Sequence, residues 1–141
     1  MQALEEVKVI ARSTMRGGKP LIEDPLFAAR IAQAEIDLEA MKITNLRMLF
    51  KAQEQGAPGP ETSLLKIKGT VINQELKDLA RRALGPAAAP FPGHVTEGNL
   101  MFGPADTEHN AARYFNNRKT SIFGGSNEIQ RNIVTKTMLE L

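Results

Sequence analysis

The feature that most constrains this chain is the stretch from Leu26 to Gln55, which neither glycine nor proline interrupts. An uninterrupted stretch of this kind between helix start and stop signals predicts a helix. Asp24 offers an N-cap acceptor, Pro25 suits the first helical position, and Gly56 suits the C-terminal cap. Two apolar stripes follow the helical period, one of Phe27, Ile31, Ala34, Leu38, Met41 and Leu49 and another of Ile36, Ile43 and Phe50. They predict burial on more than one side, as in the middle of a bundle.

Shorter segments on both sides of this stretch show the same spacing. Residues 3–16 precede a Gly17-Gly18 pair, and their apolar positions are Leu4, Val7, Ala11 and Met15. Residues 61–84 precede Gly85, with one apolar face made of Leu65, Ile72, Leu76, Leu79 and Ala83. Residues 107–119 have Asp106 as a possible cap, and they are expected to bury Ala111, Ala112 and Phe115. A last helix is expected to begin after Ser126 and to turn inward Ile129, Ile133 and Met138.

The segment between the third and fourth expected helices, Pro86–Pro104, is rich in glycine, proline and alanine. Its apolar contacts would come from Phe91, Leu100 and Phe102. A loop of this length in a compact domain is either functional or mobile. No segment alternates with period two. The sequence therefore predicts an all-α fold, an antiparallel up-and-down bundle of four or five helices with one long Gly/Pro-rich loop before the fourth helix.

Composition narrows the class of protein. The 141 residues are enough for one domain, and 18 Lys and Arg against 16 Asp and Glu leave a net charge of +2, too small a basic field for nucleic-acid binding. Cysteine is absent, which excludes disulfides and thiolate metal sites. No apolar run reaches the roughly 18 residues of a membrane span. Residues 1–10 contain Glu5 and Glu6 where a signal peptide would be basic and then apolar. We expect a soluble, cytoplasmic protein without a membrane span.

The segment most indicative of chemistry is Ser121–Ile133, in which Gly124 and Gly125 lead into the last helix. Glycines allow a ligand to approach the backbone closely, and a helix start offers free N–H groups and a positive dipole end. Ser126, Asn127 and Glu128 would lie in the first turn, where they can cap the helix or touch the same ligand. By spacing alone, an ordinary glycine turn before a capped helix is the preferred interpretation, because glycine-bounded helix starts are common.

The exact amino-acid sequence of this segment is more specific than its glycine spacing. Phe-Gly-Gly-Ser-Asn-Glu-Ile-Gln-Arg-Asn-Ile, at residues 123–133, closely resembles the last helix of acyl-CoA dehydrogenases. The run Arg-Gly-Gly-Lys-Pro-Leu-Ile-Glu-Asp-Pro, at residues 16–25, resembles the family's hinge between the first two helices of its C-terminal domain. Residues 83–86 fall where the family's third helix ends. The resemblance covers nearly the whole chain in order, and it implies that residues 1–141 are this helical domain without the family's N-terminal helical and middle β-domains.

The resemblance implies a flavoprotein oxidoreductase of fatty acid metabolism that converts an acyl-CoA to its trans-2-enoyl form. In that family a carboxylate removes the α-proton, and the β-hydrogen passes as hydride to the N5 atom of FAD. The backbone N–H matching Gly124 polarises the thioester carbonyl, which is what makes the α-proton acidic. Gly125 belongs to the same turn, and the residues matching Ser126, Asn127 and Glu128 contact FAD. Implied partners are an acyl-CoA substrate, an electron-transfer flavoprotein, and further copies of the chain in a dimer or tetramer.

The chain departs from the family at the catalytic base. Many members carry the glutamate at the position of Gly124, which has no side chain. Other members place the base on the first helix of this domain, upstream of Met1. Glu5 and Glu6 fall too late in that helix and are expected on a solvated face. We therefore predict no catalytic side chain here and no activity of this chain by itself.

Two cofactor contacts also differ. The family's Arg-x-Gln-Phe-Gly corresponds to residues 14–18, which read Thr-Met-Arg-Gly-Gly. Its Gln-x-x-Gly-Gly corresponds to residues 82–86, which read Arg-Ala-Leu-Gly-Pro. Arg16 and Arg82 can bind a pyrophosphate, because guanidinium matches phosphate geometry, or they can be surface charges.

The remaining polar residues give weaker indications. His94 and His109 are the only histidines, and no second ligand is suitably spaced, so we predict no metal site. Arg131 is expected at the surface or an interface. Arg113, Arg118 and Lys119 form a basic group whose default interpretation is a solvated face, with CoA phosphate or a partner subunit as alternatives.

Three interpretations follow. The first is a domain of an FAD-dependent acyl-CoA dehydrogenase, either a piece of a longer protein or a short gene product. The second is a non-catalytic assembly subunit of a hetero-oligomeric acyl-CoA dehydrogenase that has lost flavin binding. The third is an unrelated helical interaction module, which does not explain residues 121–133. None of these residues specifies the acyl chain.

Overall fold

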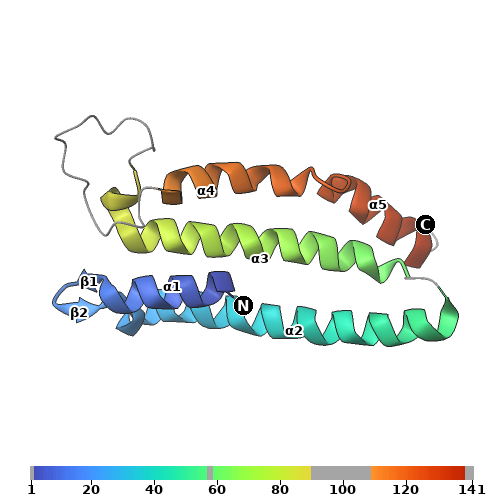
Figure 1. Ribbon diagram of the computed structural model, residues 1–141, viewed down its shortest axis with the longest axis horizontal. Helices are drawn as coiled ribbons and strands as arrows, with labels where there is room; N and C mark the ends of the chain where they lie inside the picture. Colours follow the sequence, from blue (N-terminus) through green and yellow to red (C-terminus); the bar gives the residue numbers. More distant parts are fainter. Residues whose placement is uncertain (1, 57–58, 90–108, 139–141) are drawn as a thin grey trace. The chain divides into compact units, whose positions relative to one another are not determined.

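The computed structural model describes residues 2–56, 59–89 and 109–138, which form five α-helices, several short 3-10 helices and one two-stranded hairpin. The predicted all-α fold is confirmed. The chain divides into two compact units, residues 1–34 with 73–118 and residues 35–72 with 119–141. Helices α2 (Pro25–Gln55) and α3 (Glu61–Leu84) each contribute to both units, and Figure 1 traces them along the chain.

The first unit opens with α1 (Gln2–Ser13), whose apolar residues Leu4, Val7 and Ala11 are buried as predicted. Met15 is a correction. The helix ends at Ser13, and Met15 lies 61% exposed in strand β1 (Met15–Arg16), which pairs with β2 (Lys19–Pro20). Gly17 and Gly18 both have positive φ, at 59° and 79°, as a two-residue hairpin turn of type I′ requires. The turn therefore forms a hairpin where helical spacing had suggested a fourth turn of helix.

Local signals determine the start of α2. The 3-10 helix η1 (Leu21–Glu23) leads to Asp24, whose Oδ1 accepts a 2.8 Å hydrogen bond from the Phe27 N–H, so the predicted N-cap is confirmed. In this unit α2 buries Phe27, Ile31 and Ala34, and α3 buries Leu76, Leu79, Ala80 and Ala83. Gly85, with φ of 56°, ends α3 as predicted, and the 3-10 helix η2 (Gly85–Ala88) follows.

Charged side chains join the helices of the first unit. Asp78 of α3 accepts bonds from Arg30 of α2 and from Arg81 and Arg82 of its own helix. Burial alone would raise the pKa of Asp78, but the hydrogen bonds from these three guanidiniums outweigh it and hold the pKa below its ordinary value. The carboxylate therefore stays ionised and connects two helices.

Helix α4 (Asn110–Asn116) completes the described part of this unit. The expected start at Thr107, the cap Asp106 and the contacts Phe91, Leu100 and Phe102 lie outside the described residues. The α-helix ends at Asn116, and the chain continues as the 3-10 helix η4 (Asn117–Ser121), whereas a helix to Lys119 had been expected. Ala111 is buried and Ala112 partly so, but Phe115 is 64% exposed, contrary to prediction.

Tyr114 of α4 is held by two arginines of the same unit. The Arg81 and Arg118 guanidinium carbons lie 4.8 and 4.5 Å from the centroid of its ring. Arg118 also donates a hydrogen bond to the tyrosine hydroxyl and another, of 3.1 Å, to Gln74 of α3. Cation–π contacts of this kind fix the ring and the helix that bears it.

In the second unit α2 and α3 run antiparallel, because ion pairs join residues rising along one helix to residues falling along the other. Asp37 pairs with Lys68 at 2.8 Å, and Lys51 pairs with Glu61 at 2.9 Å. Gly56 caps α2 as predicted, with φ of 77° and a 2.8 Å bond from its N–H to the Ala52 carbonyl.

The second unit leaves many apolar side chains exposed, which corrects the predicted burial. In α2 the whole second stripe and Leu49 of the first are exposed, while Leu38 and Met41 are half-buried. Helix α5 (Asn127–Met138) buries no residue completely, and its three residues expected inside are exposed: Ile129, Ile133 and Met138. The apolar faces exist, but the described chain does not cover them.

Candidate functional site

The site predicted from the sequence is a turn in the second unit between η4 and α5. Gly124 and Gly125 have φ of 67° and 85°, a conformation that other residues rarely adopt. A Cβ atom on Gly124 would meet no atom within 4 Å, so this part of the backbone is open to a ligand. A Cβ atom on Gly125 would lie 2.8 Å from Nε2 of Gln130. The backbone conformation therefore favours glycine at both positions, and a Cβ atom at Gly125 would also displace the Gln130 side chain.

Side chains of α5 fold back to fix this turn. The Ser126 Oγ accepts a 3.3 Å bond from the Ile129 N–H, so the predicted cap is confirmed. Gln130 Nε2 donates to the Gly124 carbonyl at 2.8 Å, and the Gln130 N–H donates to the Ser126 carbonyl at 3.0 Å. A side chain of α5 thus fixes the Gly124 carbonyl through a hydrogen bond.

A lysine of α3 joins the turn from the other side. Lys66 Nζ lies 2.7 Å from the Asn127 Oδ1 and 3.2 Å from the Ser121 carbonyl oxygen. The hydroxyl of Thr70, one turn further along α3, donates to the Lys66 carbonyl and lies 3.4 Å from the Thr120 carbonyl. Two segments more than 40 residues apart in sequence are therefore joined by these bonds.

Glu128 lies in the first turn of α5 and is exposed. Hydrogen bonds from its own backbone N–H and from the Ser126 hydroxyl lower the pKa of this carboxyl, and the charges of Arg131 and Lys66 add to the effect. Glu128 therefore stays ionised. An ionised carboxylate accepts hydrogen bonds from ligand hydroxyls, as on a ribose or ribityl chain, and repels phosphate.

No side chain of the turn occupies the position of the missing base, since that residue is Gly124. Glu6, expected on a solvated face, lies instead in the first unit between two cations, with Lys77 at 3.3 Å and Arg113 at 2.9 Å. Glu5 is exposed and pairs with Lys8. Neither carboxylate belongs to the unit that contains the glycine turn.

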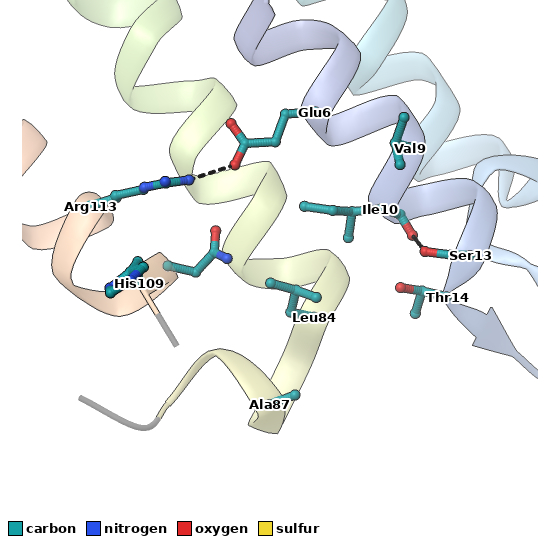
Figure 2. A pocket seen from close by; sticks show the side chains of 10 residues that line it. Glu6, Val9, Ile10, Ser13, Thr14, Leu84, Ala87, His109 and Arg113 are labelled. Carbon is teal, nitrogen blue, oxygen red and sulfur yellow. Dashed lines mark hydrogen bonds and ion pairs between the residues drawn. The ribbon is translucent and has the colours of Figure 1, made fainter. Parts of the chain in front are cut away.

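Glu6 and Arg113 line a pocket of about 680 Å³ in the first unit, shown in Figure 2. Its wall combines apolar Val9, Ile10, Leu84 and Ala87 with polar Ser13, Thr14, His109 and Asn110. The pair between Glu6 and Arg113 crosses from α1 to α4, so the two charges at this pocket neutralise each other.

The two arginines predicted as phosphate ligands also lie in the first unit. Arg82 is exposed and donates through Nε to Asp78, which also receives two other guanidiniums. Arg16 is exposed on strand β1. The open glycine turn fits a flavin, and both arginines belong to the unit that does not contain this turn.

The other polar candidate residues each contact a different partner. Arg113 pairs with Glu6, Arg118 with Gln74 and Tyr114, and Lys119 lies over the Phe123 ring at 5.3 Å. All three residues are exposed, in agreement with the solvated face expected for this basic group. Arg131 is exposed and lies 3.8 Å from Glu128. His94 lies outside the described residues. Within residues 2–56, 59–89 and 109–138, no cluster of three His, Cys, Asp or Glu could hold a metal ion.

Sequence reasoning missed Lys66 and assigned no role to Gln130. A signal for Lys66 exists in the pattern of α3, where Ser63, Lys66 and Thr70 recur at spacings of three and four on one face. Ser63 and Thr70 are buried, which marks a polar strip directed at another part of the chain. The pattern indicates that this face of α3 contacts another segment of the chain, but not which segment.

Comparisons with known proteins agree with this architecture. The family model described as acyl-CoA dehydrogenase, C-terminal domain, matches residues 1–139. No curated protein sequence matches. The ChsE4-ChsE5 complex from Mycobacterium tuberculosis contains a chain of similar structure, with a TM-score of 0.73, 25% identity, and coverage of 99% of this chain and 35% of that one.

Two further structures share the fold. One is a putative acyl-CoA dehydrogenase from Mycobacterium abscessus, with a TM-score of 0.75, 21% identity, and coverage of 98% of this chain and 31% of that one. The other is the FAD complex of PigA, with a TM-score of 0.74, 19% identity, and coverage of 97% and 32%. The chain thus spans about a third of the length of these proteins. No helix among the described residues is long and apolar enough to cross a membrane.

Proposed function

We propose, since this chain belongs to the acyl-CoA dehydrogenase family, that it forms the C-terminal helical domain of an FAD-dependent enzyme that desaturates an acyl-CoA thioester. The observation that carries the proposal is the Gly124–Gly125 turn, which combines positive φ, an open backbone and a capped helix start. The bound flavin would supply the oxidising power of the reaction. The rest of the enzyme would lie in the two-thirds of its relatives' length that this chain does not span.

The turn itself is proposed to position the flavin and to polarise the thioester carbonyl. The Gly124 N–H is proposed to donate to the thioester carbonyl, because the open backbone lets a ligand approach and α5 begins directly after the turn. A helix start favours negative charge, such as the charge that develops on that oxygen when the α-proton leaves. Gly125, Ser126, Asn127 and Glu128 are proposed to face FAD hydroxyls rather than phosphates, in keeping with the ionised Glu128.

The catalytic base is proposed to come from a part of the enzyme outside this chain. Gly124 has no side chain, and Glu6 is engaged by Lys77 and Arg113 in the other unit. This chain is accordingly proposed to be inactive by itself.

The exposed apolar side chains of the second unit support assembly with further subunits. They include Ile43 and Phe50 of α2 and Ile129 and Ile133 of α5. Exposed apolar surface of this kind is typical of interfaces. We propose a dimer or tetramer that passes electrons to an electron-transfer flavoprotein.

A second candidate is a non-catalytic subunit of a hetero-oligomeric dehydrogenase. The specific observation in its favour is that Arg82, at the position of the family's flavin-contacting glutamine, is bonded through Nε to Asp78. The solved ChsE4-ChsE5 complex is itself an assembly of two different proteins.

The dissociation constant for FAD separates the two candidates. It is measured by flavin fluorescence and calorimetry on this chain and on any longer protein that contains it. Tight binding by the longer protein, weakened by Gly125→Ala but not by Gly56→Ala, supports the enzyme, because both glycines have positive φ and only Gly125 lies in the turn. Failure of the longer protein to bind flavin supports the assembly subunit.

A further inference from the structure

We infer that Lys66 is a positioning residue for the glycine turn, holding its two ends and placing a positive charge beside the first turn of α5. The inference rests on the proposed function, because the turn is where thioester and flavin are proposed to bind. Lys66 itself touches neither in this proposal.

The geometry is that of one ammonium bridging two points. Lys66 Nζ contacts the Ser121 carbonyl oxygen before the turn and the Asn127 Oδ1 after it, at 3.2 and 2.7 Å. The turn between these two contacts includes both positive-φ glycines. A glycine pair gains flexibility from its missing side chains, so a conformation of this kind needs support from outside the turn. Lys66 provides that support from α3, a helix of 24 residues.

The side chain is suited to this role. Lys66 is partly buried, and its neighbours on the same face, Ser63 and Thr70, are buried. An ammonium has three N–H donors and no acceptor, so two of them satisfy the two oxygens and a third remains. Hydrogen bonds from a charged donor are shorter and stronger than neutral ones, in agreement with the short contact to Asn127.

The charge has a second consequence. Helix α5 already presents a positive dipole end at this point, and Lys66 adds a full charge to it. The pKa of Glu128 responds to that charge, although hydrogen bonds from its backbone and Ser126 lower it more. Negative charge developing on a ligand oxygen at the turn would be stabilised in the same way.

The test compares three single variants. Lys66→Met keeps an unbranched side chain one atom shorter and removes both bonds, and Lys66→Arg restores charge and donors. Lys68→Met is the matched control, because Lys68 lies on the same helix and pairs with Asp37 of α2. Nuclear magnetic resonance of the 141-residue chain reports the amide shifts of Gly124 and Gly125. Flavin affinity is measured on the protein in its natural assembly.

We expect Lys66→Met to move both glycine amide shifts and to weaken flavin binding by about tenfold, the effect of one charge-assisted hydrogen bond. Lys66→Arg should restore most of the affinity, and Lys68→Met should change neither readout. Should Lys66→Met fail to fold, Lys66→Gln, which is uncharged and shorter than lysine, replaces it in both measurements.

Unchanged glycine shifts in Lys66→Met would overturn the inference. So would moved shifts with unchanged flavin affinity, because the turn would then be held without consequence for the ligand. Absence of flavin binding in the unmodified assembly would instead refute the proposed function, and the glycine shifts would still decide whether Lys66 holds the turn.

Discussion

Replacing Gly125 by alanine tests how the turn before α5 is built. The backbone at Gly125 has φ of 85°, and a residue with a Cβ atom at positive φ costs roughly 1–2 kcal/mol. The new Cβ would also lie 2.8 Å from Nε2 of Gln130, the end of a flexible side chain that can move. Moving it gives up the bond to the Gly124 carbonyl, worth about 1 kcal/mol. Gly125→Ala should therefore cost about 2–3 kcal/mol.

Gly124→Ala is the matched control. Its φ of 67° imposes the same kind of backbone strain, but its Cβ would meet nothing within 4 Å. We expect a cost of roughly 1–2 kcal/mol for this variant. In a Gln130→Ala background the cost of Gly125→Ala should fall to the same value, because the bond it disrupts is already absent.

The assay is native-state hydrogen exchange of the Gln130 amide, whose N–H donates to the Ser126 carbonyl at the start of α5. This amide reports opening of the helix start even where the rest of the chain stays folded. Equal costs for the two glycines, or a cost at Gly125 that persists without Gln130, would refute this account of the turn.

Four further outcomes are expected. Asp78→Asn should lower stability by about 1–3 kcal/mol near neutral pH, since three partly exposed guanidinium contacts contribute up to about 1 kcal/mol each. The folded-state pKa of Asp78 lies below its ordinary 3.8, so the unmodified chain should lose this contribution as pH falls through the folded-state value. In urea titrations from pH 7 to 2, the free energy of unfolding should therefore fall less steeply in acid for the variant than for the unmodified chain. Leu79→Ala, at a fully buried position, should cost about 2–5 kcal/mol in urea unfolding, and a cost below 1 would contradict the assigned core. Glu6→Gln should cost about 1 kcal/mol in the same assay, whereas Glu5→Gln, on the exposed face, should be nearly neutral. Phe50→Lys should reduce self-association of the chain in light scattering at high concentration, and a monomeric unmodified chain would count against the proposed interface.

Helix boundaries were the part of the fold most accessible from sequence. Asp24, Gly56, Gly85 and Ser126 each act through bonds or backbone angles within a few residues, and the structure has each of them in its predicted place. Met15 was predicted wrongly because two local signals compete there. Its spacing continues the apolar stripe of α1, but the Gly17-Gly18 pair favours a hairpin turn. The structure has the hairpin.

Burial was predictable only where the chain itself provides the covering surface. Leu79 and Ile31 are buried, whereas Phe50 and Ile133 follow the same spacing and are exposed. An apolar stripe indicates that a helix has a face to bury, but not which surface covers it.

The glycine turn was predicted from its own residues, whereas its support was not. Lys66 lies 61 residues before Asn127, so their contact depends on how two helices pack. Asp78 likewise holds Arg82 through a bond along one helix that the spacing of four allows but does not require.

The environment of Tyr114 has a practical consequence for spectroscopy. The chain contains one tyrosine and no tryptophan, so its near-ultraviolet absorbance and intrinsic emission are dominated by this one ring. That ring belongs to the first unit and is contacted by Arg81 and Arg118, also of that unit. Loss of those contacts can therefore be followed optically for the first unit alone, while far-ultraviolet circular dichroism follows the helices of both.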